Sequence, residues 1–268
     1  MRILIIGGGN MGATFAKSFI RSHSADSKKV MILEILSEKI EALKKAKIGQ
    51  VFSEPKECVP LADIIILAVK PQSAGALFAQ MKDFVDKQQV IVSIMAGVQI
   101  STIREGLGAT KIIRAMPNLP AQIGQGMTVY TSTDDVTRIE LVMVQNLLNT
   151  TGKAIFVSKE AKIDAGTAIS GSGPAYVFYF INALKEAAQK MGFSESASQL
   201  LVTQTFKGTV SLFEQSERDC KEWIDMVASK GGTTEAALKS FGSNHVHELI
   251  MQGAEAALAR AIELGKMP

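Results

Sequence analysis

RILIIGGGNMG, the stretch from Arg2 to Gly12, decides the fold of this chain. Its apolar run, Ile3–Ile6, predicts a buried strand, and an amphipathic helical pattern follows. The glycines between them have the spacing G-x-G-x-x-G, at Gly7, Gly9 and Gly12. In such a strand–turn–helix unit the first glycine permits a tight turn, the second lets the backbone approach a pyrophosphate, and the third lets the helix pack close to the strand. The stretch therefore predicts a dinucleotide-binding loop.

The helix after this loop adds a second reason to expect a dinucleotide. Its first N–H groups have no partner inside the helix, and the helix dipole places partial positive charge at the same end. Phosphate groups bind readily at such a helix start. We therefore expect Asn10 and Met11, which lie between the glycines, to contact the cofactor with them. The alternative is a glycine-rich turn that binds no ligand.

Short apolar runs alternate with amphipathic stretches through the first half of the chain. The runs are rich in Ile and Val and almost continuously apolar, which is typical of strands buried on both faces of a parallel sheet. This alternation predicts an α/β fold with an N-terminal Rossmann-type, doubly wound, mostly parallel sheet. The expected strands are Arg2–Ile6, Val30–Glu34, Asp63–Val69, Val90–Ile94, Lys111–Ala115 and Met127–Tyr130, and the expected helices between them are Met11–His23, Ser37–Lys45, Ser73–Val85 and Ile100–Leu107.

The second half of the chain is expected to be helical. After an expected strand at Lys153–Val157, no convincing strand pattern is present in the sequence. We therefore expect residues 1–160 to form the dinucleotide-binding Rossmann domain and residues 161–268 to form an all-helical C-terminal domain. Its expected helices are Ala161–Met191, which Pro174 and the glycines around it interrupt, Ser194–Glu214, Arg218–Ala228 and Thr234–Leu264.

Composition argues against several classes of protein and site. With 268 residues and a net charge of +3, the chain lacks the basic excess expected of a nucleic-acid or membrane-surface protein. No apolar run reaches the ~20 residues of a membrane helix. The N-terminus also lacks the pattern of a signal peptide. Cys58 and Cys220 are too few for a disulfide framework or a zinc cluster, which favours a cytoplasmic protein without a metal site.

Glu34 ends the second expected strand, close to the ~20 residues after the glycine loop at which an acid is expected. Such a carboxylate accepts hydrogen bonds from the hydroxyls of the adenine ribose and repels a 2′-phosphate. No arginine follows Glu34, although Lys39 is near. The sequence therefore predicts NADPH or NADH as the cofactor and favours NADH. The alternative is an exposed charge at a strand end.

Four further segments resemble the pyrroline-5-carboxylate reductase family. They are AVKP at Ala68–Pro71, IRAMPNLPAQIGQG from Ile113, SGSGPAY from Ser170 and ASKGGTTEAAL from Ala228. Their order and spacing, together with the total length, extend the resemblance over essentially the whole chain, and the last two segments are the most specific. The resemblance implies the last step of proline biosynthesis, in which hydride passes from NAD(P)H to C5 of L-1-pyrroline-5-carboxylate and gives L-proline.

The same resemblance implies cofactor contacts beyond the glycine loop. AVKP follows an expected strand, at the edge where open α/β sheets bind ligands. The plain alternative is that Pro71 and Gly97 only form turns. The residues that the resemblance places along the nicotinamide half of the cofactor are Ala68, Val69, Lys70, Pro71, Ala96 and Gly97.

The segment from Ser229 to Thr234 is expected to bind the substrate. Its two glycines give backbone freedom and its two threonines stand at an expected helix start, so it predicts a small anion pocket with neutral donors. The resemblance implies that the substrate carboxylate binds the N–H groups around Gly232, and that Thr234, as the catalytic residue, meets the imine nitrogen with its hydroxyl. The alternative is a plain capped helix start. The expected substrate-binding residues are Glu160, Ser229, Gly231, Gly232, Thr233 and Thr234.

Three positions depart from the family pattern, and two other functions stay open. Lys230 replaces a usual proline, Pro55 replaces a frequent asparagine on the adenine side, and Met226 replaces a more polar residue near the substrate. A 3-hydroxyacid dehydrogenase would need a catalytic lysine early in the helix after SGSG, but Lys185 is too far along. A non-catalytic protein that binds NAD(H) is also compatible with the departures.

The helical half is expected to carry the subunit contact. Runs such as LLVTQTFKGTVSLF and ELIMQGAEAALARAI have apolar residues on more than one stripe of a helix, which leaves apolar surface for a partner. We therefore expect a homodimer through this domain, which the resemblance extends to a larger ring. Neither nucleic acid nor a membrane is an expected partner.

Overall fold

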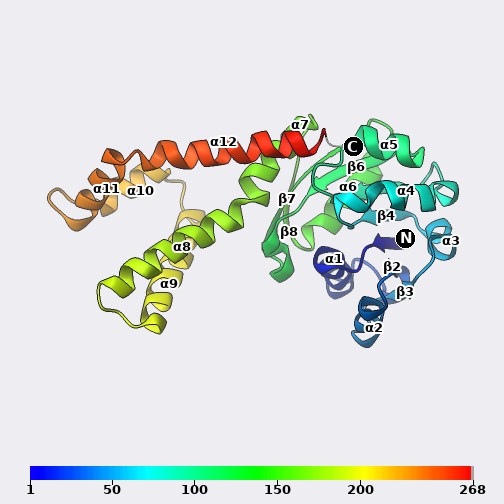
Figure 1. Ribbon diagram of the computed structural model, residues 1–268, viewed down its shortest axis with the longest axis horizontal. Helices are drawn as coiled ribbons and strands as arrows, with labels where there is room; N and C mark the ends of the chain where they lie inside the picture. Colours follow the sequence, from blue (N-terminus) through cyan, green and yellow to red (C-terminus); the bar gives the residue numbers. More distant parts are fainter. Residues whose placement is uncertain (267–268) are drawn as a thin grey trace. The chain divides into compact units, whose positions relative to one another are not determined.

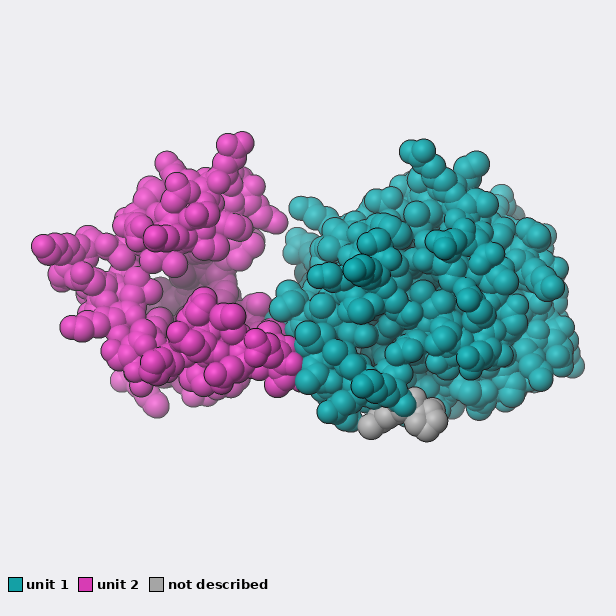
Figure 2. All heavy atoms as spheres, turned by 90° about the horizontal axis from the view of Figure 1, so that it is seen from above, with its two compact units in different colours: residues 1–174, 257–268 teal, residues 175–256 magenta. Residues whose placement is uncertain are grey.

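The computed structural model describes residues 1–266, so the last two residues of the expected second domain lie outside the described residues. The chain forms two compact units (Figure 2). The first, here called the sheet unit, contains Met1–Pro174 and Ala257–Pro268, and the second, the helical unit, contains Ala175–Ala256. The first helix after residue 160 thus packs with the sheet.

One sheet of eight strands forms the centre of the sheet unit (Figure 1). Its strand order is β3-β2-β1-β4-β5-β6-β7-β8, and all neighbouring strands are parallel except β6 and β7. The order reverses between β1 and β4, as in a doubly wound sheet, so the expected fold class is confirmed. The strands are β1 Ile3–Ile6, β2 Val30–Leu33, β3 Gln50–Phe52, β4 Ile64–Leu67, β5 Val90–Ser93, β6 Ile112–Met116, β7 Gly126–Ser132 and β8 Gly152–Phe156.

The strands form where β-branched and other large apolar residues are continuous. All four residues of β1 and all four of β4 are buried, because helices cover both faces of the sheet. The strand β3 was not expected from the sequence. It has only three residues at the sheet edge, and Gln50 at its start is exposed, so no apolar run marks it.

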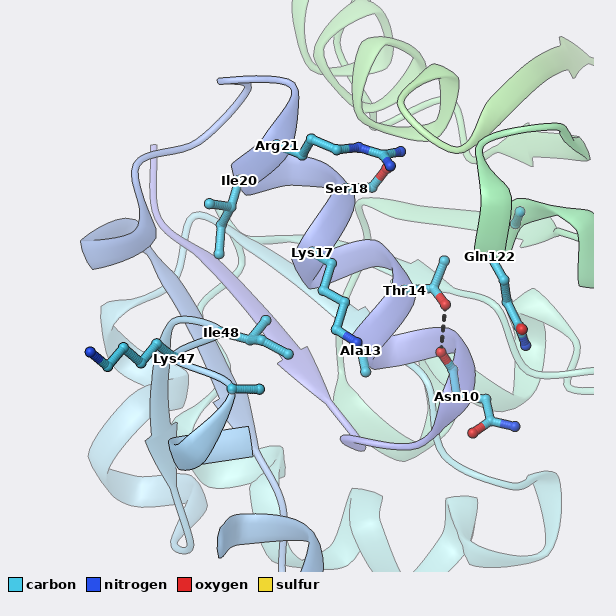
Figure 3. Close-up of a pocket in the computed structure, with 12 residues that line it drawn as sticks. Asn10, Ala13, Thr14, Lys17, Ser18, Ile20, Arg21, Lys47, Ile48 and Gln122 are labelled. Atoms are coloured by element: carbon cyan, nitrogen blue, oxygen red, sulfur yellow. Dashed lines mark hydrogen bonds between the residues drawn. The ribbon is translucent and has the colours of Figure 1, made fainter. Parts of the chain in front are cut away.

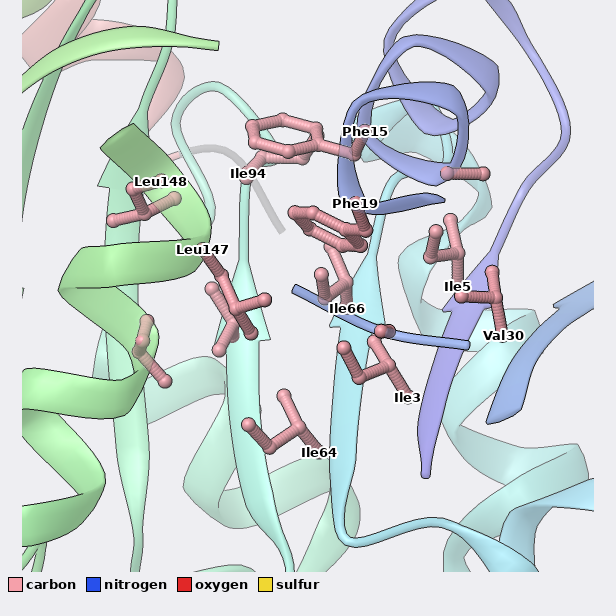
Figure 4. Packing of buried hydrophobic residues seen from close by; sticks show 14 of the residues in the cluster. Ile3, Ile5, Phe15, Phe19, Val30, Ile64, Ile66, Ile94, Leu147 and Leu148 are labelled. Carbon is pink, nitrogen blue, oxygen red and sulfur yellow. The ribbon is translucent and has the colours of Figure 1, made fainter. Parts of the chain in front are cut away.

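Helices cover the two faces of the sheet and form two apolar layers. On one face Phe15 and Phe19 of α1 pack with Leu147 and Leu148 of α6 over the central strands (Figure 4). The helix α2 adds Leu43 to this layer. The other layer contains side chains of α3, α4 and α5. These helices are α1 Asn10–Arg21, α2 Ser37–Lys45, α3 Pro55–Cys58, α4 Ala74–Met81, α5 Ile100–Leu107 and α6 Arg138–Asn149, with short 3-10 turns η1 Ser27–Lys29, η2 Val59–Leu61, η3 Pro71–Ser73, η4 Lys82–Phe84 and η5 Leu119–Ile123.

The segment after Glu160 is interrupted, as the glycines and Pro174 predict. The helix α7, Ala161–Gly166, passes into one π-helical turn, Thr167–Gly171, before α8 begins. In that turn the N–H of Ser172 donates to the carbonyl oxygen of Thr167 (2.8 Å), and the Ser170 hydroxyl donates to the Gly166 carbonyl (2.9 Å). A π-helical turn inserts an extra residue and so displaces the later residues of the segment along the helix.

The helical unit consists of helices alone within its described residues. A single helix from Thr234 to Leu264 was expected, and this expectation is wrong. The helix ends at Ser243 and a new one begins at Val246, because His245 between them adopts the left-handed conformation, with φ 53°. The helices from this point of the chain are α8 Gly173–Lys190, α9 Glu195–Glu214, α10 Cys220–Val227, α11 Thr233–Ser243 and α12 Val246–Leu264, whose last residues belong to the sheet unit.

Two kinds of feature are absent from the described residues. Within residues 1–266, no helix has the length and apolar character needed to cross a membrane. Over the same range, no group of three or more His, Cys, Asp and Glu side chains is arranged to hold a metal ion.

Candidate functional site

The glycine loop joins β1 to α1, and its first and third glycines have no room for a side chain. Gly7 has φ 101°, and a Cβ there would lie 2.8 Å from the Ala68 carbonyl oxygen. A Cβ on Gly12 would overlap the carbonyl oxygen of Gly7. These contacts draw α1 and the turn after β4 close to β1.

The second glycine of the loop faces open space, and the helix start beside it has free donors. A Cβ on Gly9 would meet nothing within 4 Å. The Gly9 carbonyl accepts the N–H of Ala13 (2.9 Å), but the N–H groups of Asn10 and Met11 make no hydrogen bond within the described chain. Free N–H groups at the start of a twelve-residue helix, next to open backbone, fit the pyrophosphate of a dinucleotide.

Glu34 follows β2 and is held against the glycine loop. Its Oε2 accepts the N–H of Gly8 (3.0 Å), and its Oε1 accepts those of Ile35 (2.9 Å) and Leu36 (3.0 Å). The side chain is only 6% exposed, and the Lys39 ammonium lies 3.9 Å from Oε2. The carboxylate is therefore fixed by backbone donors at the end of β2.

Two further turns end neighbouring parallel strands. Ala68 and Val69 follow β4 and lie against Gly7, whereas Lys70 is exposed and Pro71 begins the turn η3. Ala96 and Gly97 follow β5, and the left-handed φ of Gly97 is 76°. Because β1, β2, β4 and β5 are parallel neighbours, these turns and the glycine loop share one edge of the sheet. That edge includes the point where the strand order reverses, where open α/β sheets bind ligands.

A separate hollow of about 680 Å³ runs along the outer surface of α1 (Figure 3). Lys17, Arg21 and Lys47 line it together with polar and apolar side chains, and the Lys47 side chain points away from the others (Figure 3). Of the expected cofactor residues, only Asn10 borders this hollow. The hollow therefore lies beside the glycine loop and is distinct from the sheet edge.

The segment from Ser229 to Thr234 lies in the helical unit and forms a turn into α11. The Gly232 N–H donates to the Ser229 carbonyl (2.9 Å), and the Gly231 N–H donates to the carboxylate of Glu235 (2.5 Å). Gly231 has φ 74°. The N–H groups of Thr233 and Thr234, in the first turn of α11, make no hydrogen bond within residues 1–266. They are the donors that this turn offers to a ligand, and Thr234 is half-buried.

Glu160 is part of an ion-pair network that the sequence analysis did not predict. Its Oε1 accepts a hydrogen bond from Arg114 (2.9 Å) and another from the Ile100 N–H (2.8 Å). Arg114 also donates to Asp164 (2.8 Å). One signal was available, because a charged residue inside the apolar run of β6 must be paired when it is buried. The partners could not be named, since they lie 46 and 50 residues away.

Asn118 ties together three segments of the sheet unit. Its amide nitrogen donates to the carbonyl of Ser170 in the π-helical turn (3.0 Å), and its amide oxygen accepts the N–H of Met127 on β7 (2.8 Å). Both ends of the amide are therefore used inside the protein, which makes Asn118 a structural link between the MPN and SGSG segments.

The three departures from the family pattern take ordinary positions. Pro55 occupies the first turn of α3, where its missing N–H costs nothing. Met226 is 60% exposed on α10, and Lys230 is exposed in the turn before Gly231. None of the three disturbs the glycine loop or the start of α11.

Comparison with known proteins decides the family. Residues 160–264 match the family described as pyrroline-5-carboxylate reductase dimerisation, and residues 2–97 match the one described as NADP oxidoreductase coenzyme F420-dependent. A pyrroline-5-carboxylate reductase of Pseudomonas aeruginosa is 35% identical over 99% of this chain and 97% of its own length. The chain belongs to the pyrroline-5-carboxylate reductase family. Pyrroline-5-carboxylate reductase 2 of Bacillus subtilis is 31% identical over 98% of this chain and 95% of that protein.

Solved structures of the family superpose on nearly the full length of the chain. The reductase of Coxiella burnetii has a TM-score of 0.91 at 30% identity and covers 99% of both chains. That of Plasmodium falciparum, solved with NADP bound, has a TM-score of 0.89 at 30% identity over 99% of this chain and 98% of its own. The chain is therefore a nicotinamide-dependent oxidoreductase with a dimerisation region, and the expected family is confirmed.

Proposed function

We propose that this chain reduces L-1-pyrroline-5-carboxylate to L-proline. The observation that carries the proposal is the convergence of the glycine loop, Glu34 and the Ala68–Val69 turn at one sheet edge, in a chain of this family. When bound, the reduced nicotinamide supplies the hydride that C5 of the substrate accepts.

The dinucleotide is held by backbone groups on the sheet unit. The N–H groups of Asn10 and Met11 bind the pyrophosphate, which approaches over the open backbone at Gly9. Ala68–Pro71, Ala96 and Gly97 line the nicotinamide half. Because these contacts come from segments that follow separate strands of one sheet, they fix the orientation of the cofactor as well as its affinity.

The substrate is held by the start of α11. Its carboxylate accepts the free N–H groups of Thr233 and Thr234, where the helix dipole favours an anion. The Gly231 N–H already binds the carboxylate of Glu235, which supports the capacity of this turn to bind such a group. Ser229 and Gly232 shape the turn through their mutual hydrogen bond. The hydroxyl of Thr234 contacts the ring nitrogen. Glu160, on the sheet unit, is the remaining residue that the family resemblance assigns to the imino acid.

No strong acid is needed in this chemistry. A C=N nitrogen is basic enough to carry its own proton, and as an iminium it is already electrophilic. Thr234 then orients the protonated nitrogen by accepting its N–H, whereas a carbonyl substrate would require a positioned His or Lys donor.

NADH is the preferred cofactor in this proposal. The Glu34 carboxylate is buried, and three backbone N–H groups fix it at the end of β2, so it cannot easily turn away from a 2′-phosphate. Bringing a phosphate beside it costs like-charge repulsion, which Lys39 offsets only in part because its side chain is 47% exposed. The ribose hydroxyls of NADH, by contrast, can donate to the carboxylate.

The direct test follows the absorbance of reduced nicotinamide with purified protein and pyrroline-5-carboxylate, with NADH and NADPH in parallel cuvettes. Rapid loss of absorbance that depends on the substrate is expected, and it is expected to be faster with NADH. Faster loss with NADPH would overturn the cofactor preference alone. No loss with either, while dinucleotide binding persists, would overturn the reductase and favour a non-catalytic NAD(H)-binding protein.

A further inference from the structure

We infer that Arg114 is a positioning residue that fixes the turn from Ala96 to Ile100 through the carboxylate of Glu160. This inference rests on the proposed function in one respect, since that turn is taken to line the nicotinamide half of the cofactor. The network itself lies wholly within the sheet unit.

Arg114 is held by two carboxylates. It lies on β6 with a side chain only 2% exposed, and its two terminal nitrogens donate to Glu160 (2.9 Å) and Asp164 (2.8 Å). A buried guanidinium is stable only when it is paired, and its planar fork suits two separate acceptors. The same bonds fix both acids, which stand four residues apart at the start of α7.

Glu160, held in place by Arg114, also binds the first residue of α5. The oxygen that binds Arg114 also accepts the N–H of Ile100, the first residue of α5, at 2.8 Å. The N–H of a first helical residue has no acceptor inside its helix, and Gln99 at the cap position provides no side-chain bond. A carboxylate 60 residues along the chain therefore caps this helix, at the end where the dipole favours a negative charge.

The capped residue closes the turn that begins after β5. Gly97, in the middle of that turn, is left-handed, and a Cβ on it would come within 3.2 Å of Leu264 at the end of α12. The turn is therefore fixed from two sides, by Glu160 at the start of α7 and by Leu264. Within the described residues no hydrogen bond joins Arg114 to Gly97 or Ile100, so its effect on the turn passes through Glu160.

The other oxygen of Glu160 leaves room for a second role. Oε2 makes no hydrogen bond within the described residues, and the side chain is 32% exposed. Contact with the imino acid through Oε2 would thus be compatible with the cap through Oε1. The two roles differ in their kinetics, because a substrate contact changes the KM for the imine, whereas a displaced turn changes kcat.

The test compares Arg114→Met and Arg114→Lys with Asp164→Asn in the full chain. Asp164→Asn is the matched control, because it removes the negative charge of the other acceptor of the same guanidinium and leaves the bond between Glu160 and Ile100. For Arg114→Met, kcat is expected to fall by about 10- to 100-fold, as for a misplaced reactant, with less than about a threefold change in KM for NADH. Arg114→Lys is expected to recover part of kcat, and Asp164→Asn to lose much less.

Hydrogen–deuterium exchange at the Ile100 amide monitors its hydrogen bond to Glu160 independently of catalytic activity. Arg114→Met is expected to accelerate this exchange. Where Arg114→Met does not fold, Glu160→Ala, which removes the acceptor itself, is expected to accelerate the exchange in the same way. An unchanged kcat and Ile100 exchange in a folded Arg114→Met would overturn the inference, as would an equal loss of kcat in Asp164→Asn. Absence of turnover in the unsubstituted protein would overturn the proposed function instead, while the exchange measurement would still decide the role of Arg114.

Discussion

The two units of this chain bury their apolar residues to very different extents. The sheet unit encloses two apolar layers, one on each face of the sheet. In the helical unit, residues 175–256, Val202 is the only buried hydrophobic residue, and Ser198 is the only other buried one. The sheet unit therefore contains its own core within one chain, whereas the helical unit does not.

The apolar side chains of the helical unit are mostly exposed instead of being buried in a core. Open apolar hollows of about 500 and 610 Å³ lie between its helices, the first beside Trp223 and the second beside Tyr179. Exposed apolar surface of this extent marks a contact with a partner. The family match to a dimerisation region agrees with this interpretation, since association with another subunit would cover this apolar surface. The large exposed side chains include Phe178, Tyr179, Leu184, Leu200, Val210, Phe213, Ile224, Val227, Phe241, Leu249 and Ile250.

Removal of a core aromatic from the sheet unit should have the largest effect. Phe19 is fully buried between α1 and the sheet, so Phe19→Ala removes buried area and leaves a cavity. It is expected to lower the free energy of unfolding by about 3–5 kcal/mol. Urea unfolding at one fixed protein concentration measures this loss. Phe84→Ala, at a side chain 37% exposed, is the control and should cost far less; equal costs would contradict the two-layer core.

Thr234→Ala should show that catalysis depends on the helical unit and that cofactor affinity depends on the sheet unit. The hydroxyl is proposed to contact the reacting nitrogen, so its loss is expected to lower kcat by about 100-fold, as for one positioned hydrogen-bonding group. The affinity for NADH, measured by fluorescence titration, should hardly change, because the glycine loop belongs to the sheet unit. Thr233→Ala is the matched control, since only the backbone of Thr233 is assigned a role. A parallel loss of NADH affinity would remove Thr234 from the catalytic role.

Substitution of one exposed apolar residue on each unit by aspartate should distinguish an apolar surface that a partner covers from one that stays in solvent. Tyr179 on α8 and Ile139 on α6 are both 74% exposed in the single chain. Tyr179→Asp is expected to weaken the assembly by about 2 kcal/mol or more, the loss typical of a buried interface aromatic. Ile139→Asp should leave the assembly unchanged. Light scattering during gel filtration, over a range of protein concentrations, measures the mass, and identical behaviour of the two variants would refute the comparison.

The sheet unit also carries the proposed cofactor preference. Glu34→Ser removes the charge that opposes a 2′-phosphate and frees Lys39 to bind it. The ratio of kcat/KM for NADH to that for NADPH is expected to fall by about tenfold, which corresponds to about 1.4 kcal/mol. Glu38→Ser, at an exposed acid in the first turn of α2, is the control. An unchanged ratio in Glu34→Ser would mean that this carboxylate only holds the loop together.

The difference between the units also explains how much could be predicted from sequence. The sheet unit was largely predictable, because Ile3–Ile6 and the other Ile- and Val-rich strands carry a local pattern that burial then satisfies. The strand β3 was not predicted, since three residues at a sheet edge need no apolar run. In the helical unit the break at His245 was not predicted. The apolar stripes continue on both sides of it, and the composition does not reveal a left-handed backbone angle at one residue.

The candidate site was predictable where one short segment forms it. The glycine loop and the turn at Gly231 and Gly232 carry their chemistry in consecutive residues. The network of Arg114 does not, since its members meet only after β6, α5 and α7 have packed. No spacing rule joins residues 46 to 60 positions apart, so such contacts become visible only in the structure.

Two capping boxes, one in each unit, offer the smallest test. Glu140 caps α6 and also bonds to Lys111 (2.8 Å), whereas Glu222 caps α10 without a lysine within the described residues. Burial would raise the pKa of Glu140, but the bonds from Lys111 and Thr137 outweigh it and lower that pKa. A folded-state pKa below the unfolded value of about 4.3 stabilises the protein at any pH above that value. This contribution disappears as the pH falls through the folded-state pKa.

Glu140→Gln should therefore lower the free energy of unfolding at pH 7, by under about 1 kcal/mol because both partners are partly exposed. This loss of stability should shrink at acid pH. Glu222→Gln should cost less at pH 7, and a Glu140→Gln deficit that stayed constant between pH 7 and pH 3 in urea unfolding would mean that the Lys111 bond contributes nothing.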